Sequence, residues 1–344
     1  ATRPWPRSMP SLQHTRLSDA VQQQVDSALA AGDRQGAMAI LRAAGAATLG
    51  ERHRIISARL KPKPELALQP PPAPTTPPVS LPSVPLPRAS AATAAIAAGQ
   101  VAFITLTNAG YLEYTINCLA SLRRVGETVP LTLYCSDQHA FANLQVSHPQ
   151  QAVALFADPA LGTFHDDGTF RSWKAPGWAH LMWLKCEVIR RALESHAYVV
   201  FTDGDIVYER CGAVHHCVEQ MLHDPKLELL MQNDGLKDTG GLDGLCAGFM
   251  CVRSTPHMRD VFSVDGRVGL DPLWDDQMYL NSELHRIRHR ALPLHLFPNG
   301  QYFRFHYGGL IAAHAPSSTF LVHFNWLVGG EKKAAMEEHN RWFI

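Results

Sequence analysis

The chain has 344 residues, which is longer than one average domain. Its 31 Lys and Arg residues balance its 31 Asp and Glu residues, so the sequence indicates neither a nucleic acid nor an acidic membrane surface as a partner. No stretch of the sequence reaches the ~18 apolar residues that a membrane helix needs. The chain starts at Ala1, so we expect membrane attachment only through an anchor that this sequence does not include.

The seven cysteines are odd in number and include no Cys-x-x-Cys pair. This pattern excludes a complete disulfide framework and argues against a structural zinc site. Most of the cysteines lie in apolar contexts that are typical of buried thiols. Cys211 and Cys217 are near enough in sequence to pair in an oxidising compartment.

Proline is concentrated between two regions of different character. Residues 62–87 hold eleven of the 24 prolines. Proline fixes φ and removes a backbone donor, so we expect an extended linker over residues 61–97. Residues 1–60 precede it as a helical segment, because apolar residues recur at helical spacing in Asp19–Ala31 and Asp33–Ala44. Residues 98–344 form the main domain.

Strands and helices alternate through the main domain. The expected elements, in chain order, are a strand over 101–106, a helix over 111–124, strands over 131–135 and 152–156, a helix over 178–195 and a strand over 197–201. This order predicts an α/β fold with a Rossmann-like, mostly parallel sheet flanked by helices on both faces. Ligands of such sheets bind outside the carboxyl ends of the strands. Asn108, Asp137 and Asp203 lie at those ends.

The strongest chemical signal is Asp203-Gly204-Asp205, directly after a buried strand. Two carboxylates in one turn supply the oxygen ligands that Mg²⁺ and Mn²⁺ prefer, and such a cation typically bridges protein carboxylates to phosphates. Asp and Gly also favour turns for conformational reasons alone, so a structural turn is the alternative interpretation of the isolated triplet.

A second signal lies far downstream, where His323 ends a short apolar strand and Lys332 follows a glycine turn. The imidazole of His323 would complete a metal site with Asp203 and Asp205, and the Lys332 ammonium would meet phosphate as a point charge. The alternative is a buried histidine with satisfied hydrogen bonds and a solvated lysine.

These residues occur together in one known family. The motifs, in order, are Thr105–Tyr111, Asp137, Trp183-Leu184-Lys185, Asp203-Gly204-Asp205, Gly248-Phe249, Asp276-Gln277 and His323–Lys332. The chain from about residue 98 to 340 resembles the nucleotide-diphospho-sugar transferase family that includes plant rhamnogalacturonan xylosyltransferases and extensin arabinosyltransferases. The resemblance implies a GT-A catalytic domain over 98–344, a nucleotide-sugar donor, Mn²⁺ and retention of the anomeric configuration.

The resemblance also implies roles for single residues on the nucleotide side. Thr105, Asn108 and Tyr111 would cradle the nucleoside, and Asp137 would bond the uracil or ribose edge. Lys185 would lie near the nucleotide or order the metal carboxylates. The remaining donor and metal residues are Gly204 in the donor site, Lys332 on the diphosphate, and Asp203, Asp205 and His323 on Mn²⁺ or Mg²⁺.

On the sugar side, the resemblance places Asp276 and Gln277 beside the donor sugar as the catalytic pair. Asp275 is expected to start a helix, where a carboxylate suits the dipole. Asp234, at the end of another strand, would bind sugar hydroxyls, although a turn-forming role explains Asn-Asp-Gly equally well. The chain has Cys246-Ala247 before Gly248, so the polar residue that the family has there is missing.

The sequence thus predicts a metal-dependent, retaining glycosyltransferase that uses a UDP-sugar and a glycan or glycoprotein acceptor. Galactose, xylose and arabinose stay open as donor sugars, and Trp173, Trp178 and Trp183 would line an acceptor groove or pack in the core. The alternatives are a non-catalytic lectin-like or scaffold protein and a metal-dependent nucleotide-sugar hydrolase. Because relatives are usually Golgi-lumenal with a stem, we expect that location, with bacterial or viral origin as the alternative.

Overall fold

The computed structural model of the chain describes residues 21, 23–25, 27, 40, 90–156, 167–172, 175–236, 244–263, 275–307 and 318–344. The chain divides into two units, Ala1–Pro82 and Ser83–Ile344. In the first unit, the described residues are helical. The rest of the two expected N-terminal helices, and the linker up to residue 89, lie outside the described residues.

The second unit begins earlier than the expected linker end at residue 97. Helix α4 (Ala91–Ala97) starts at Ser90, whose side chain accepts a hydrogen bond from the Thr93 backbone N–H. Ala92 and Ala95 are buried, and the helix packs on α8 (Ala213–His223). Alanine has the highest helix propensity and its small side chain permits close packing. The alanine-rich end of the expected linker is therefore part of the folded unit.

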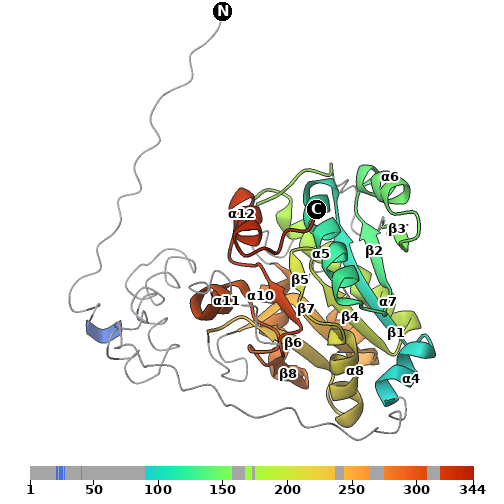
Figure 1. Cartoon of the computed structure of the whole chain (residues 1–344). Coiled ribbons are helices and arrows are strands. Elements are labelled where there is room, and N and C mark those ends of the chain that lie inside the picture. Colours follow the sequence, from blue (N-terminus) through green and yellow to red (C-terminus); the bar gives the residue numbers. More distant parts are fainter. Residues whose placement is uncertain are drawn as a thin grey trace, which may run out of the picture. The chain divides into compact units, whose positions relative to one another are not determined.

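One sheet organises this unit (Figure 1). Within the described residues it has seven strands in the order β3-β2-β1-β4-β7-β6-β8. Every neighbouring pair is parallel except the two pairs that involve β7, so β7 alone runs against the others. The strands are β1 (Val101–Thr107), β2 (Leu131–Cys135), β3 (Val153–Leu155), β4 (Tyr198–Thr202), β6 (Leu229–Asn233), β7 (Leu245–Arg253) and β8 (His289–Leu292).

Helices cover both faces of this sheet. Alternate strand residues face opposite sides, as in β1, where Phe103 joins one apolar cluster and Ile104 the other. The expected α/β fold with a mostly parallel sheet is confirmed. The first cluster includes residues of α4, α5 (Leu112–Val125), α6 (Gln138–Ser147) and α8, and the second those of α7 (Trp178–Ser195), α9 (Pro256–Val261) and α10 (Asp276–Glu283).

A second, two-stranded sheet brings the C-terminal region to the main sheet. Strand β5 (Ile206–Tyr208) pairs antiparallel with β9 (Leu321–His323). A third apolar cluster lies beneath it and includes Val207 and Val322. Helices α11 (Gly300–Tyr307) and α12 (Gly330–Glu338) and the short 3-10 helices η1 (Ala109–Tyr111) and η3 (Leu284–Arg286) complete the described elements.

The sheet order creates a natural binding position. The chain passes from β1 to β2 on one side, but it continues from β3 to β4 on the other side of β1. The connections after β1 and β4 thus diverge, and ligands of open α/β sheets bind at such a point, at the carboxyl ends of the strands. Asn108 and Asp203 follow these two strands.

Two further expectations concern membranes and thiols. None of the described helices is long and apolar enough to cross a membrane. All seven cysteines are free, and all except Cys211 are buried. Cys211 and Cys217 are therefore not paired, and the buried cysteines pack as small apolar side chains.

Candidate functional site

The backbone brings Asp203, Asp205 and His323 together. Asp203 follows the end of β4, and its N–H donates to the Gly248 carbonyl at 2.7 Å. Strand β5 begins directly after Asp205, and its first residue, Ile206, pairs with His323 at the end of β9. One ligand atom from each of the three predicted metal ligands lies within 4.8 Å of the others.

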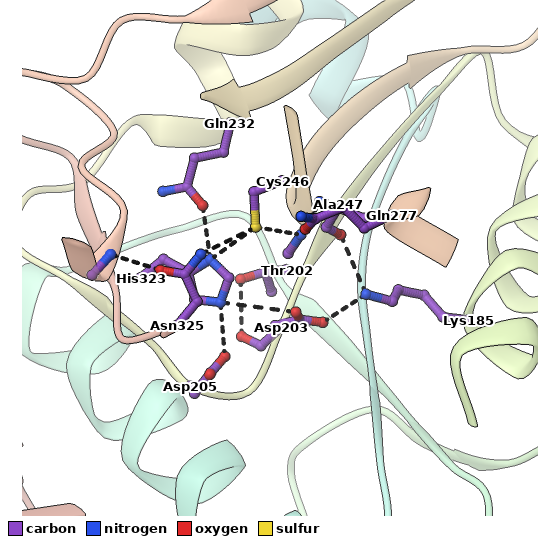
Figure 2. Close-up of polar contacts among 12 residues, drawn as sticks. Lys185, Thr202, Asp203, Asp205, Gln232, Cys246, Ala247, Gln277, His323 and Asn325 are labelled. Atoms are coloured by element: carbon purple, nitrogen blue, oxygen red, sulfur yellow. Dashed lines mark hydrogen bonds and ion pairs between the residues drawn. The ribbon is translucent and has the colours of Figure 1, made fainter. Parts of the chain in front are cut away.

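Hydrogen bonds determine which nitrogen of His323 faces the carboxylates (Figure 2). The Gln232 amide nitrogen donates to two backbone carbonyls, of Phe297 and Pro298, at 3.0 Å each, so its oxygen must point the other way. That oxygen lies 2.8 Å from His323 Nδ1 and accepts a hydrogen bond from the Nδ1–H. This orientation places Nε2 at 3.1 Å from Asp205 Oδ1 and at 3.9 Å from Asp203 Oδ2.

This donor set fits a divalent cation. A bare imidazole nitrogen and two carboxylates are all acceptors, so no proton joins Nε2 to the two oxygens when the ring is neutral. A cation among them would satisfy all three groups. Two carboxylates with one imidazole suit Mn²⁺ or Mg²⁺ better than a soft metal, which prefers sulfur.

Gly248 provides the space that the imidazole occupies. A Cβ atom at this position would lie 2.1 Å from His323 Cε1 and 2.8 Å from Asp203 Oδ2. No side chain fits there, so the glycine in β7 is required for the histidine to reach the aspartates. The expected Gly248-Phe249 motif has this physical basis.

Cys246 stands two residues earlier in β7, where the family has a polar residue. Its Sγ lies 3.6 Å from His323 Nδ1, and the Asn325 side-chain amide donates to it at 3.5 Å. Burial raises the pKa of this thiol well above its usual range, so Cys246 stays protonated. It supports the residues around the site as a packed neutral group.

Two lysines, the buried Lys185 and the partly buried Lys332, neutralise the carboxylates. Lys185 Nζ lies 3.2 Å from Asp203 Oδ1 and 2.6 Å from Asp276 Oδ2, and Lys332 forms an ion pair with Asp205. Lys185 is buried by α7 between the two carboxylates, so of its two expected positions it takes the one that orders them. Three carboxylates face two ammonium groups, and the excess negative charge favours a further cation.

The two aspartates of the triplet have opposite pKa shifts. Burial raises the pKa of Asp203, and the nearby Lys185 only partly offsets this effect. Burial also acts on Asp205, but Lys332 and His323 outweigh it and hold the pKa of that carboxyl well below its usual range. Asp205 is thus ionised throughout the physiological pH range.

The start of α10 holds two aspartates with different partners, and both line the cavity. Asp275 accepts a hydrogen bond from the Met278 N–H at 2.6 Å, which confirms it as the helix cap. Asp276 is buried and turns to Lys185. Gln277 accepts from the Ala247 N–H at 3.3 Å, so the predicted catalytic pair lies beside the metal ligands.

Asp234, directly after β6, connects three elements around the cavity. Its Oδ2 accepts from Gln277 Nε2 at 3.0 Å. Its Oδ1 accepts from Asn325 Nδ2 and from Trp326 Nε1, both at 3.1 Å. Burial raises the pKa of Asp234 to about 6, against the effect of these donors. The carboxylate belongs to the site and is more than a turn residue.

The nucleoside side follows β1. Asn108 caps η1 by accepting from the Tyr111 N–H at 3.1 Å, and its amide donates to the Thr169 carbonyl at 3.3 Å. The Tyr111 hydroxyl donates to the Arg171 carbonyl, and its ring lies 4.8 Å from that of Phe170. Both predicted residues reach the cavity and hold the segment 167–172 against it.

Thr105 and Asp137 do not line this cavity. Thr105 is a buried residue inside β1, two positions before its end. Asp137 uses both carboxylate oxygens on backbone N–H groups, with Ala109 at 2.8 Å and with His139 and Ala140 at 2.9 Å. It caps α6 and ties this helix to the turn after β1, and the nucleotide contact implied by the resemblance stays a prediction.

The cavity has a volume of about 440 Å³, which suits a small-molecule ligand. Of the three tryptophans considered for an acceptor groove, Trp178 lines it, Trp183 packs in the core against Tyr279, and Trp173 lies outside the described residues. The predicted residues that line it are Asn108, Tyr111, Lys185, Asp203, Gly204, Asp205, Asp234, Asp276, Gln277, His323 and Lys332.

Several contributors were not predicted from sequence. Gln232 sets the orientation of His323, and a polar residue at the end of the apolar run Leu229–Met231 was the signal for it. Asn325 and Trp326 belong to a motif that was recognised without roles for them. Thr107, Thr115, Ser136, Phe170 and Arg171 line the cavity without any comparable sequence signal.

Comparisons with known proteins give a family and several solved structures. The structure of mouse xyloside xylosyltransferase 1 is similar over 66% of this chain and 98% of its own, with 12% identity and a TM-score of 0.43. The structure of a glycosyltransferase involved in the glycosylation of the major capsid of PBCV-1 is similar over 69% of this chain and 98% of its own, with 12% identity and a TM-score of 0.42. The structure of the galactosyltransferase LgtC in complex with donor and acceptor sugar analogs is similar over 69% of this chain and 95% of its own, with 10% identity and a TM-score of 0.42.

The comparison with curated protein sequences gives no match. The sequence model of the nucleotide-diphospho-sugar transferase family matches residues 130–336, which is more than half of the chain. This range includes the two aspartates, the histidine and both lysines of the site. The chain therefore belongs to the nucleotide-diphospho-sugar transferase family and is a glycosyltransferase with a GT-A type α/β sheet.

Proposed function

We propose that the chain is a metal-dependent, retaining glycosyltransferase that moves a sugar from a UDP-sugar to a glycan or glycoprotein acceptor. One observation carries the metal part of this proposal: ligand atoms of Asp203, Asp205 and His323 converge within 4.8 Å. The family requires a nucleotide-sugar donor. Mn²⁺ or Mg²⁺ is the cation that this set of oxygen and nitrogen ligands fits.

In this proposal, the nucleoside and the sugar of the donor bind at different positions along the sheet. Asn108 and Tyr111 would hold the nucleoside beyond β1, while Asp276 and Gln277 would hold the sugar on the opposite side of the metal ligands. When bound, the cation would stabilise the negative charge of the departing diphosphate. Lys332, beside Asp205, would add a second positive charge at the same place.

Asp276 and Gln277 would act on the donor sugar during transfer. Asp276 is held by Lys185, and its charge would stabilise the positive anomeric centre that develops as the glycosidic bond breaks. Gln277 is fixed between the Ala247 N–H and Asp234, so its amide offers a rigid polar contact to the donor sugar. An acceptor hydroxyl that attacks from the face of the leaving diphosphate would retain the configuration. Galactose, xylose and arabinose are the candidate donor sugars.

Calorimetry tests the metal and nucleotide sites together. UDP should bind the full chain in the presence of Mn²⁺, and Asp205→Asn should weaken this binding at least about 100-fold, because one ligand and one negative charge are lost. Asp224→Asn is the matched control, since Asp224 is a half-exposed surface residue paired with Arg290. Unchanged UDP binding by Asp205→Asn would refute the metal site.

A donor screen read by mass spectrometry then tests the reaction. We expect transfer from one of the UDP-sugars to a glycan acceptor, and NMR of the product should show the anomeric configuration of the donor. Product of the opposite configuration would refute retention. Turnover as fast without an acceptor as with one would favour a nucleotide-sugar hydrolase.

A further inference from the structure

Trp326 exposes its large aromatic side chain at the cavity. Its exposed fraction is 56%, and it lines the same cavity as Asp203, Asp205 and His323. Six large hydrophobic side chains are exposed among the described residues, and three of them, Phe170, Trp326 and Val328, line this cavity. Exposed apolar groups that gather at a polar cavity mark a binding surface.

The indole of Trp326 is held in one position. Its Nε1 donates to Asp234 Oδ1 at 3.1 Å, and the preceding residue, Asn325, donates to the same oxygen. Asn325 is itself fixed, because its side-chain oxygen accepts from the Gly300 N–H at 2.7 Å. The ring therefore faces solvent with little side-chain entropy left to lose on binding.

The backbone at this position also favours a specific role for the side chain. Trp326 has a φ of 63°, in the left-handed region that a bulky residue rarely adopts. Glycine or asparagine would adopt this conformation with less strain. Strained backbone of this kind is concentrated at ligand-binding sites, where the side chain is needed.

The sheet order places Trp326 on the acceptor side of the donor. The nucleoside residues follow β1, the metal aspartates follow β4, and Asp234 follows β6, which lies on the far side of β4 and β7 from β1. Trp326 is bonded to Asp234, which also holds Gln277 beside the expected donor sugar. An acceptor must approach the anomeric carbon from solvent on this side.

Asp234 can also receive a substrate hydroxyl. An ionised carboxylate has about four acceptor positions. Within the described part of the chain, three donors use them: Gln277, Asn325 and Trp326. The remaining acceptor position belongs to a carboxylate that lines the cavity next to the exposed indole.

We propose that Trp326 and Asp234 form an acceptor subsite for the terminal pyranose of a carbohydrate, whose apolar C–H face stacks on the indole while a ring hydroxyl donates to Asp234. This inference rests on the proposed transferase function. A pyranose combines an apolar face with a hydroxyl edge, which matches an aromatic face that has a carboxylate at its edge. The acceptor is thus recognised through a sugar, in a glycan or on a glycoprotein, and not through a peptide side chain.

Two variants of the full chain test the subsite. Trp326→Asn removes the ring and tolerates the positive φ, so it should fold without new strain. Trp326→Phe keeps an aromatic face but loses the N–H that anchors it. Val146→Ala is the control, because Val146 is 84% exposed on α6 and does not line the cavity.

The probes are the methyl glycopyranosides of glucose, galactose and xylose, each added to protein loaded with UDP and Mn²⁺. Saturation-transfer NMR should show contact with the C–H face of at least one glycoside in the wild-type protein and in Val146→Ala. Trp326→Asn should weaken that glycoside's affinity about tenfold, and Trp326→Phe about threefold. The Kd of UDP should change less than about twofold in both Trp326 variants.

The outcomes separate this inference from the proposed function. A wild-type chain that does not bind UDP with Mn²⁺ would refute the transferase proposal. If UDP binds but no glycoside shows saturation transfer, or if Trp326→Asn binds the glycoside as tightly as the wild-type protein, the acceptor subsite alone is refuted. A loss of UDP affinity as large as the loss of glycoside affinity would place Trp326 in the donor site instead.

Discussion

Aspartates at the ends of two parallel strands of the same sheet serve opposite purposes. Asp137, after β2, accepts hydrogen bonds from three backbone N–H groups. Asp203 and Asp205, after β4, have carboxylates that bond only to side chains in the part of the chain that the structure describes. The difference lies in the element that comes after each strand.

A helix comes after β2, and its first N–H groups have no partner within the helix, so they capture the nearest carboxylate. A strand, β5, comes after the β4 turn, and its backbone groups pair with β9 instead. The aspartates of that turn keep their oxygens available for a cation. An aspartate at a strand end is thus a cap or a ligand according to which element supplies the next backbone donors.

The largest effect is expected from a substitution that displaces the His323 imidazole from the two aspartates after β4. Gly248→Ala should abolish Mn²⁺-dependent UDP binding, with a loss of at least about 100-fold, because the new Cβ would lie 2.1 Å from His323 Cε1. Gly330→Ala is the matched control, since a Cβ there meets no atom within 4 Å. Calorimetry measures both variants. Wild-type affinity in Gly248→Ala would show that the imidazole is not needed in this position.

A smaller effect is expected from the residue that orients the histidine. Gln232→Leu should lower the affinity for Mn²⁺ about 10- to 100-fold, because Nδ1 loses its acceptor and the ring can turn or change tautomer. Electron paramagnetic resonance of free Mn²⁺ gives this affinity without substrate. Gln220→Leu, at a surface glutamine that bonds Arg290, is the control. Equal affinities in the two variants would contradict the role of Gln232.

The smallest effect is expected at Asp137, the aspartate that follows β2. Asp137→Ala should reduce the free energy of unfolding by about 1 kcal/mol, the cost of a lost helix cap, and should change the Kd of UDP much less than Asp205→Asn does. Urea unfolding and calorimetry measure the two quantities. A loss of UDP affinity as large as that of Asp205→Asn would instead support the nucleotide contact that the resemblance implies for Asp137.

Much of the fold was predictable because its strands and helices are long and strongly patterned. The helix expected over 178–195 and the strand expected over 131–135 have the same bounds in the structure. The linker end was predicted too late, because alanines at 91–97 form a helix once α8 is present to pack against. The proline content of the sequence gives no information on the contact between α4 and α8.

The candidate site was predictable only where a motif is local. Asp203-Gly204-Asp205 could be identified from one turn, and His323 from its own motif. Gln232 could not be assigned a role, because its function depends on the carbonyls of residues 297 and 298 and on a histidine far along the chain. The nucleotide contact of Asp137 stays a prediction, because a strand-end carboxylate looks the same in sequence whether or not backbone donors use it.

The sequence by itself determined the alternation of strands and helices, the two carboxylates after β4 and the glycine turn that leads to Lys332. Hydrophobic periodicity and turn chemistry are local properties, so the chain carries them without its fold. Only the tertiary structure decided that β9 pairs with β5, that Gly248 leaves room for the imidazole, and that Gln232 contacts its Nδ1 so that Nε2 faces the aspartates. These depend on strand register and on atoms that meet across long stretches of sequence, where a side chain's role is set by which donors and acceptors its neighbours have already used.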